Sequence, residues 1–175
     1  MALLGLLGKA GVGEVPQPLT RNPVIAVAVV MFAIEFVVDK IPYVDTTWDV
    51  VHTAIRPAVG SVLGVEFADA NQADALLGGA EGGTTALASH AVKAGIRLGI
   101  NTSPEPVTNI VASVFEDLAV AGVVVLALEE PVLAASIAVV LLLTGAIVVV
   151  LLAKAIRRAF RAWRDHRTPP TPPPP

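Results

Sequence analysis

Six ionisable residues within largely apolar stretches are the candidates for chemistry in this sequence. They are Glu35, Arg56, His90, Lys93, Glu116 and Asp117. Counted at about 1.5 Å per residue from the ends of the helices predicted below, they lie roughly 6–15 Å from one end of a helical bundle and form one layer. In lipid each charge costs about 2.5–3.5 kcal/mol, so these groups should face inward and pair. The first pairs expected are Glu35 with Lys93, and Arg56 with Glu116 or Asp117.

Two kinds of role fit such an intramembrane charge layer. Acidic and basic groups inside a membrane build proton relays and ion paths, and the same groups can instead lock helices in register. The sequence leaves both roles open. No nucleophile–base pair is visible, there are no cysteines, and the three histidines are scattered along the chain. His90 is therefore interpreted as an interior histidine with satisfied hydrogen bonds, and no enzyme activity, catalytic residue, cofactor or metal is predicted.

The longest apolar segment is the reason to expect a membrane. Residues 132–153 are 22 consecutive uncharged, mostly apolar residues, followed by Lys154 and five arginines. A helix of this length spans roughly 33 Å, which is enough to cross the hydrocarbon core of a bilayer. The composition agrees, because 54% of the residues are hydrophobic and only 15% are charged, whereas a soluble domain carries about 25% charged residues.

Shorter apolar segments complete an all-α bundle of five to six transmembrane helices over residues 1–160. Residues 1–8 fit the end of a first helix, and further helices are predicted over residues 24–38, 50–67, 75–100 and 107–128. Thr46 with Asp49 three residues later resembles a capping box that opens the helix at 50–67. Arg56-Pro57 predicts a kink or break within that helix. Residues 161–175 are predicted to form a basic, proline-rich cytoplasmic tail that ends in solvated polyproline II.

Closely spaced glycines mark the segment 75–100 as a helix that packs against another helix. They are Gly78, Gly79, Gly82 and Gly83. Glycines four residues apart let two helix backbones approach closely in lipid. The pattern favours helix packing over a ligand site.

The distribution of basic residues predicts the orientation of the bundle. With the C-terminus in the cytoplasm, ten of the twelve lysines and arginines lie on or toward the cytoplasmic side, and only Lys9 and Arg21 lie outside. This bias fits the positive-inside rule. The C-terminal arginines are interpreted as a topology signal with affinity for anionic lipid, and not as a nucleic-acid site.

Two turn segments, together with residues elsewhere, carry a family resemblance. The segments are Glu-Phe-Val-Val-Asp-Lys-Ile-Pro-Tyr-Val-Asp-Thr-Thr-Trp-Asp at 35–49 and Asn-Thr-Ser-Pro-Glu-Pro at 101–106. With Ile55-Arg56-Pro57, residues 82–90, Lys93 and Glu116-Asp117, they resemble the DUF4126 family over about residues 3–160. The resemblance implies a bacterial multi-pass protein of the cytoplasmic (inner) membrane. It implies no activity, because the function of that family is unknown.

Two functions are expected from these features. The first is a non-enzymatic accessory or scaffold subunit of a larger membrane complex, such as a respiratory complex, with the lipid bilayer and other membrane protein subunits as partners. Small size and the absence of a recognisable soluble domain favour this function. The alternative is a small transporter or channel that uses the charge layer.

Overall fold

A computed structural model of the chain describes residues 1–41, 44–100 and 106–167, and over these residues the protein is helical, with no strand. The elements in chain order are α1 (Ala2–Lys9), the 3-10 helix η1 (Gln17–Thr20), α2 (Asn22–Val38), α3 (Val44–Ala70), α4 (Ala75–Ile100), α5 (Pro106–Glu129) and α6 (Pro131–Arg167). The predicted all-α class is therefore confirmed. The extended tail predicted over residues 168–175 and most of the turn at 101–106 lie outside the described residues.

Two helices are long and apolar enough to cross a membrane by length and composition. The candidate spans are Ile110–Glu129 in α5 and Pro131–Arg164 in α6, and α2 is a shorter apolar helix. This number is lower than the five to six spans expected, because α3 and α4 carry many polar and charged residues.

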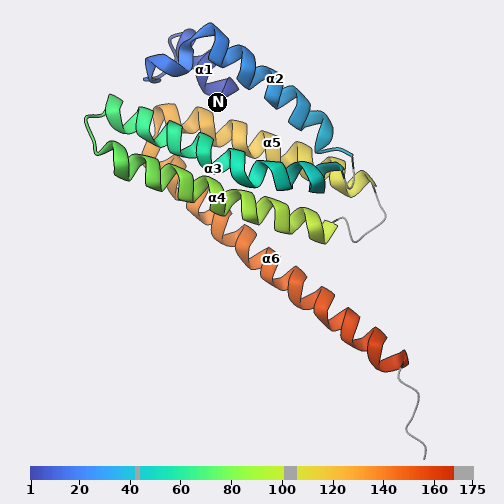
Figure 1. The fold of residues 1–175 in the computed structure, drawn as a ribbon. Coiled ribbons are helices and arrows are strands. Elements are labelled where there is room, and N and C mark those ends of the chain that lie inside the picture. The colour runs from blue at the N-terminus through green and yellow to red at the C-terminus, as the bar shows by residue number, and fades with distance from the viewer. Residues whose placement is uncertain (42–43, 101–105, 168–175) are drawn as a thin grey trace, which may run out of the picture.

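The helices are arranged around an antiparallel pair, α3 and α4, which lie side by side along most of their length (Figure 1). In the same view α1 and α2 lie along one side of this pair. Helix α6 packs against α4 and α5, crosses the bundle diagonally and continues well past its end. Leu152 still lies against Gly99 of α4, and beyond it α6 extends away from the other described helices (Figure 1).

Four glycines bring α3 and α4 into close contact near the loop that joins them. Gly60 and Gly64 of α3 face Gly78 and Gly82 of α4, and we call these four residues the glycine seam. A Cβ added to Gly78 would lie 2.5 Å from the carbonyl oxygen of Gly64, and one added to Gly60 would lie 2.5 Å from that of Gly82. No side chain fits at such distances, so the backbones themselves are in contact.

The other predicted packing glycines lie beside the seam. A Cβ on Gly79 would be 3.0 Å from Val65 Cγ2, and one on Gly83 would be 3.3 Å from the carbonyl oxygen of Pro57. Helix α4 uses further glycines toward α6, where Gly95 lies against Val149. Small residues thus line two sides of α4.

Helix α3 differs from its predicted form at both its start and its middle. It begins at Val44 and runs through Pro57 to Ala70 without interruption. The predicted start at residue 50 is therefore wrong, and of the predicted kink or break at Arg56-Pro57 the break is absent; the side chain of Thr46, the proposed cap, lies outside the described residues. Proline removes one backbone hydrogen bond from a helix, and here close packing against Gly83 accompanies the continuous helix.

The distribution of buried side chains is the reverse of that in a water-soluble domain. Among the described residues few apolar side chains are buried: Leu19, Ile25, Ala68 and Ala134. The buried polar or charged residues are more numerous: Asp39, Asp45, Asp49, His52, His90, Lys93, Arg97 and Ser113. Large apolar side chains of α2, α5 and α6 are exposed instead. Charged residues are almost never fully buried in soluble proteins unless paired, so the polar interior is the main candidate for a site.

Candidate functional site: a buried charge cluster

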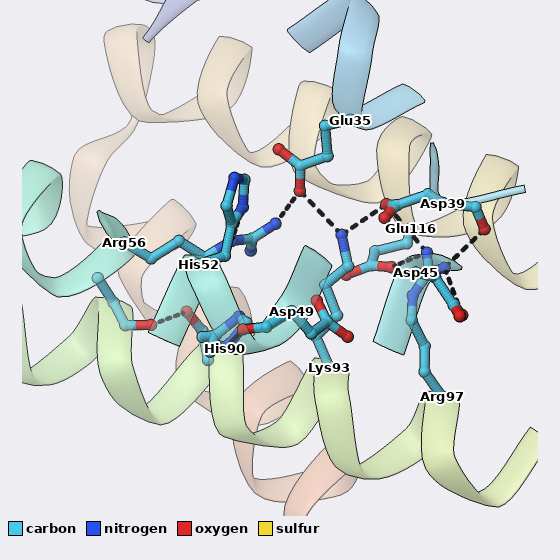
Figure 2. Close-up of polar contacts among 12 residues, drawn as sticks. Glu35, Asp39, Asp45, Asp49, His52, Arg56, His90, Lys93, Arg97 and Glu116 are labelled. Atoms are coloured by element: carbon cyan, nitrogen blue, oxygen red, sulfur yellow. Dashed lines mark hydrogen bonds and ion pairs between the residues drawn. The ribbon is translucent and has the colours of Figure 1, made fainter. Parts of the chain in front are cut away.

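The buried charged residues gather at one end of the bundle, where four helices meet (Figure 2). The end of α2, the first half of α3, the second half of α4 and the first half of α5 contribute the side chains. We call the following ten residues the charge cluster: Glu35, Asp39, Asp45, Asp49, His52, Arg56, His90, Lys93, Arg97 and Glu116.

Lys93 links three of the four helices at the centre of the cluster. Its Nζ lies 2.7 Å from Asp39 Oδ2 and 3.0 Å from Glu35 Oε1, both on α2. The same Nζ lies 3.8 Å from Glu116 Oε1 on α5. The lysine itself is buried, so its charge is balanced by protein carboxylates in place of water.

Arg97, one turn further along α4, joins all four helices. Its Nη1 donates to the backbone oxygen of Asp39 at 2.7 Å, and its Nη2 donates to Asp39 Oδ2 at 3.0 Å. Nη2 also lies 3.3 Å from Glu116 Oε2, and Nη1 lies 3.5 Å from Asp45 Oδ2 on α3. Asp39 caps the C-terminus of α2, where a negative charge is unfavourable beside the helix dipole. The arginine and lysine offset that cost.

Two further pairs flank this centre. Arg56 of α3 pairs with Glu35, and its Nε lies 3.5 Å from His52 Nδ1. On the other side Lys40 Nζ lies 3.9 Å from Asp117 Oδ2 and 3.1 Å from the centroid of the Phe36 ring. The Lys40–Asp117 pair is partly exposed, so solvent screens it more than the central contacts.

A neutral polar contact between α3 and α4 continues the cluster toward the glycine seam. His90 Nε2 lies 3.0 Å from the backbone oxygen of Asp49 and 3.1 Å from Thr53 Oγ1. Thr53 in turn donates to the same Asp49 oxygen at 2.9 Å. Polar contacts therefore follow the α3–α4 interface from the bundle end to its middle.

The structure brings five of the six sequence-predicted residues into one cluster. Glu35, Arg56, His90, Lys93 and Glu116 belong to it, and Asp117 lies at its edge with Lys40. The expected pair of Lys93 with Glu35 is present. The expected pairing of Arg56 with Glu116 or Asp117 is wrong, because Arg56 pairs with Glu35. The helix rise per residue gives the position of a residue along a helix, but not the direction in which its side chain points.

Sequence reasoning missed half of the cluster, although a signal was present. Asp45, Asp49, His52 and Arg56 recur at i, i+4, i+7 and i+11 along α3, which is one helix face. Because this helix was predicted to begin at residue 50, Asp45 and Asp49 were not expected to share a face with His52 and Arg56. Asp39 and Arg97 were also missed as members of the charge layer.

The cluster contains more carboxylates than permanent cations. Five carboxylates face the three permanent cations Arg56, Lys93 and Arg97, which leaves a net charge of −2 when both histidines are neutral. Over the described residues, no group of three or more side chains of His, Cys, Asp or Glu is placed to hold a metal ion. The surface hollows along α4 and α6 are lined by other residues. Ion pairing and proton exchange are thus the chemistry that this arrangement supports.

Comparison with known proteins gives one match. A family model described as a domain of unknown function (DUF4126) matches residues 1–151. No curated protein and no solved structure matches the chain.

Proposed function

This chain belongs to the DUF4126 family, and we propose that it is a multi-pass membrane protein that acts as a non-enzymatic accessory or scaffold subunit of a larger membrane complex. One observation carries the scaffold role. Helix α6 continues as a helix past its apolar segment to Arg167, and the large aromatic side chains in this part are more than half exposed.

The membrane part of the proposal is supported by the reversed burial. Charged groups lie inside and large apolar side chains lie outside, and in lipid this arrangement satisfies both. Two helices are apolar enough to cross a membrane on their own. Helices α3 and α4 have 27 and 26 residues, so each is long enough to span about 30 Å of hydrocarbon with its polar face turned inward. We propose that α2 to α6 all lie within the bilayer.

The orientation proposed places the charge cluster and the C-terminal end of α6 toward the cytoplasm of a bacterial inner membrane. The chain contains no cysteine, so single cysteines can be labelled without background. In sealed vesicles with a known side outward, an impermeant maleimide should label Asn71→Cys from the periplasmic side and Ala162→Cys from the cytoplasmic side. Labelling of both from one side would contradict the proposed topology.

The second half of α6 has two chemically distinct faces. Residues 154–167 extend roughly 21 Å beyond the apolar segment as one continuous helix. Ile156, Phe160 and Trp163 recur at i, i+4 and i+7 and share one face. Lys154, Arg158 and Arg161 lie on the opposite face, and Arg157 and Arg164 border the aromatic face. Such a helix suits a partner that is apolar along its centre and acidic at its edge.

The position of the exposed aromatic residues beyond the apolar segment distinguishes this part of α6 from the lipid-facing helices. Phe160 is 67% exposed and Trp163 is 55% exposed. Beyond the apolar segment no lipid core is available to cover them, and exposed aromatic patches in water mark protein interaction sites. We therefore assign the partner surface to this face, and the charge cluster to holding the bundle in register.

Purification from native membranes in mild detergent tests the scaffold role. The wild type should leave the membrane with a stoichiometric protein partner, and Phe160→Ala should weaken that association by about 30-fold or more, as expected for an aromatic hot spot. Phe115→Ala is the matched control, because Phe115 is 72% exposed on α5 but would face lipid. A wild type that is monomeric in detergent, or equal loss in both variants, would contradict the proposal.

A small transporter or channel is the second candidate, and the net charge of −2 in the cluster favours it. A buried excess of carboxylates provides places for cations or protons to bind. In reconstituted liposomes this function requires a measurable ion flux that Glu116→Gln or Asp117→Asn abolishes. The scaffold proposal requires no such flux.

A further inference from the structure

His90 is a buried histidine whose two ring nitrogens have different surroundings. The residue is 2% exposed. Its Nε2 lies within hydrogen-bond distance of the Asp49 backbone oxygen and of Thr53 Oγ1. Its Nδ1 is also buried and has no hydrogen-bond partner. The contacts at Nε2 decide which nitrogen carries the proton.

The Asp49 carbonyl fixes the tautomer, because a carbonyl oxygen can only accept a hydrogen bond. Nε2 must therefore donate to it at 3.0 Å. The hydroxyl of Thr53 is also committed as a donor to the Asp49 oxygen, so Thr53 can only accept from His90. Nε2 thus carries the hydrogen in the neutral ring, and Nδ1 holds a free lone pair. A buried base without a donor is costly to leave unsatisfied.

His90 belongs to a cluster that takes charged groups from four helices (Figure 2). Asp49, His52 and Arg56 lie on α3 and Lys93 lies on α4, and α2 and α5 add Glu35 and Glu116. Asp49 is buried, and its carboxylate interacts electrostatically with His90. The cluster as a whole is negative. A proton added at His90 would therefore reduce an existing imbalance.

His52 provides an internal contrast. Its Nδ1 faces the Arg56 Nε donor at 3.5 Å, so that nitrogen is already used as an acceptor and lies beside a cation. Protonating it would place two positive groups together and would lose the contact. The two histidines therefore differ in their capacity to take up a proton, although both are buried.

We propose that His90 is the proton-binding site of the charge cluster. A proton adds to Nδ1 and converts the neutral imidazole to imidazolium, while Nε2 keeps its hydrogen and its contacts with Asp49 and Thr53. The Asp49 carboxylate acts as the counter-charge, and the net charge of the cluster changes from −2 to −1. This inference does not rest on the scaffold role, since a lock between helices can bind a proton with or without a partner.

Nitrogen-15 NMR of histidine-labelled protein in lipid nanodiscs tests the proposal directly. The signals of His52 and His90 are assigned with the His52→Gln and His90→Gln variants. The second of these keeps a donor at the position of Nε2 and removes the base. At alkaline pH His90 should show hydrogen on Nε2 alone, and on acidification its Nδ1 should gain a proton before His52 changes.

The role of Asp49 is measured in the same experiment. Asp49→Asn should weaken proton binding at His90 on the order of tenfold, because the neutral amide removes the counter-charge. Asp69→Asn is the control, since Asp69 lies at the far end of α3. Three results would overturn the proposal: hydrogen on Nδ1 in the neutral ring, a His90 that stays neutral over the whole pH range in which the protein is folded, or equal effects of the two Asn variants.

Discussion

The same two helices, α3 and α4, are held together by different means at their two ends. Near the loop that joins them, the glycine seam places backbone against backbone. At the opposite end, Arg97 and Asp45 link the pair through charge, and the same arginine reaches α2 and α5. Backbone packing joins only two helices, whereas one long cationic side chain can form ion pairs with several. The contrast shows how a bundle with few buried apolar residues joins four helices at one end.

The largest effect is expected from removing the most connected cation. Arg97→Met should lower the free energy of unfolding by about 3–5 kcal/mol, because it leaves Asp39, Asp45 and Glu116 without their shared partner. Denaturant titration in lipid bicelles measures the change. The control is Arg158→Met on the exposed part of α6, which should change stability by less than about 0.5 kcal/mol. Similar values for the two variants would show that the cluster does not hold the bundle.

The stability of the glycine seam should depend on the volume of the residues in it, and not on their charge. Gly78→Ala places a methyl group 2.5 Å from the Gly64 carbonyl oxygen, and relieving that overlap should cost about 1–3 kcal/mol. Gly122→Ala on α5 is the matched control, since nothing lies within 4 Å of its added Cβ. The control should be neutral or stabilising by about 0.5–1 kcal/mol, because alanine favours the helix. A neutral Gly78→Ala would argue against backbone contact at the seam.

The ion pair at the edge of the charge cluster should contribute least to the free energy of unfolding. Lys40→Met removes a partly exposed ion pair with Asp117 and the contact with the Phe36 ring. Exposed pairs contribute about 0.2–1 kcal/mol, so the loss should stay below about 1 kcal/mol in the same titration and shrink further at high salt. A loss as large as that of Arg97→Met would erase the distinction between the centre and the edge.

The sequence predicted which segments are helical better than where each helix begins and ends. The helix predicted over 75–100 matches α4, and the apolar segment 132–153 lies within α6, which continues to Arg167 through residues 161–167 that were predicted as part of the tail. The start of α3 was missed because Asp45, Thr46, Thr47 and Asp49 resemble a polar link. Asp45 and Asp49 are buried, and Asp45 pairs with Arg97 of α4, a tertiary contact that the local sequence does not reveal.

The candidate site was predictable in depth and not in direction. Helix rise alone placed Glu35, Lys93 and Glu116 in one layer, and the structure joins them through Lys93. The pairing of Arg56 depends on how α3 is rotated against α2, which the sequence does not give. Gly60 and Gly64 of α3 lie four residues apart, the same spacing that marked α4, so this half of the seam could have been predicted, although not which helix would pack against it.

The central claim is that charges from different helices neutralise one another inside the bundle, and a double-mutant cycle on Lys93 and Glu35 tests it most directly. Their side chains meet at 3.0 Å across α4 and α2. The free energy of unfolding is measured for the wild type, Lys93→Met, Glu35→Gln and the double variant. We predict that the double variant loses less stability than the two single variants lose in total, by about 0.5–3 kcal/mol. Losses that add to within about 0.3–0.5 kcal/mol would contradict the account.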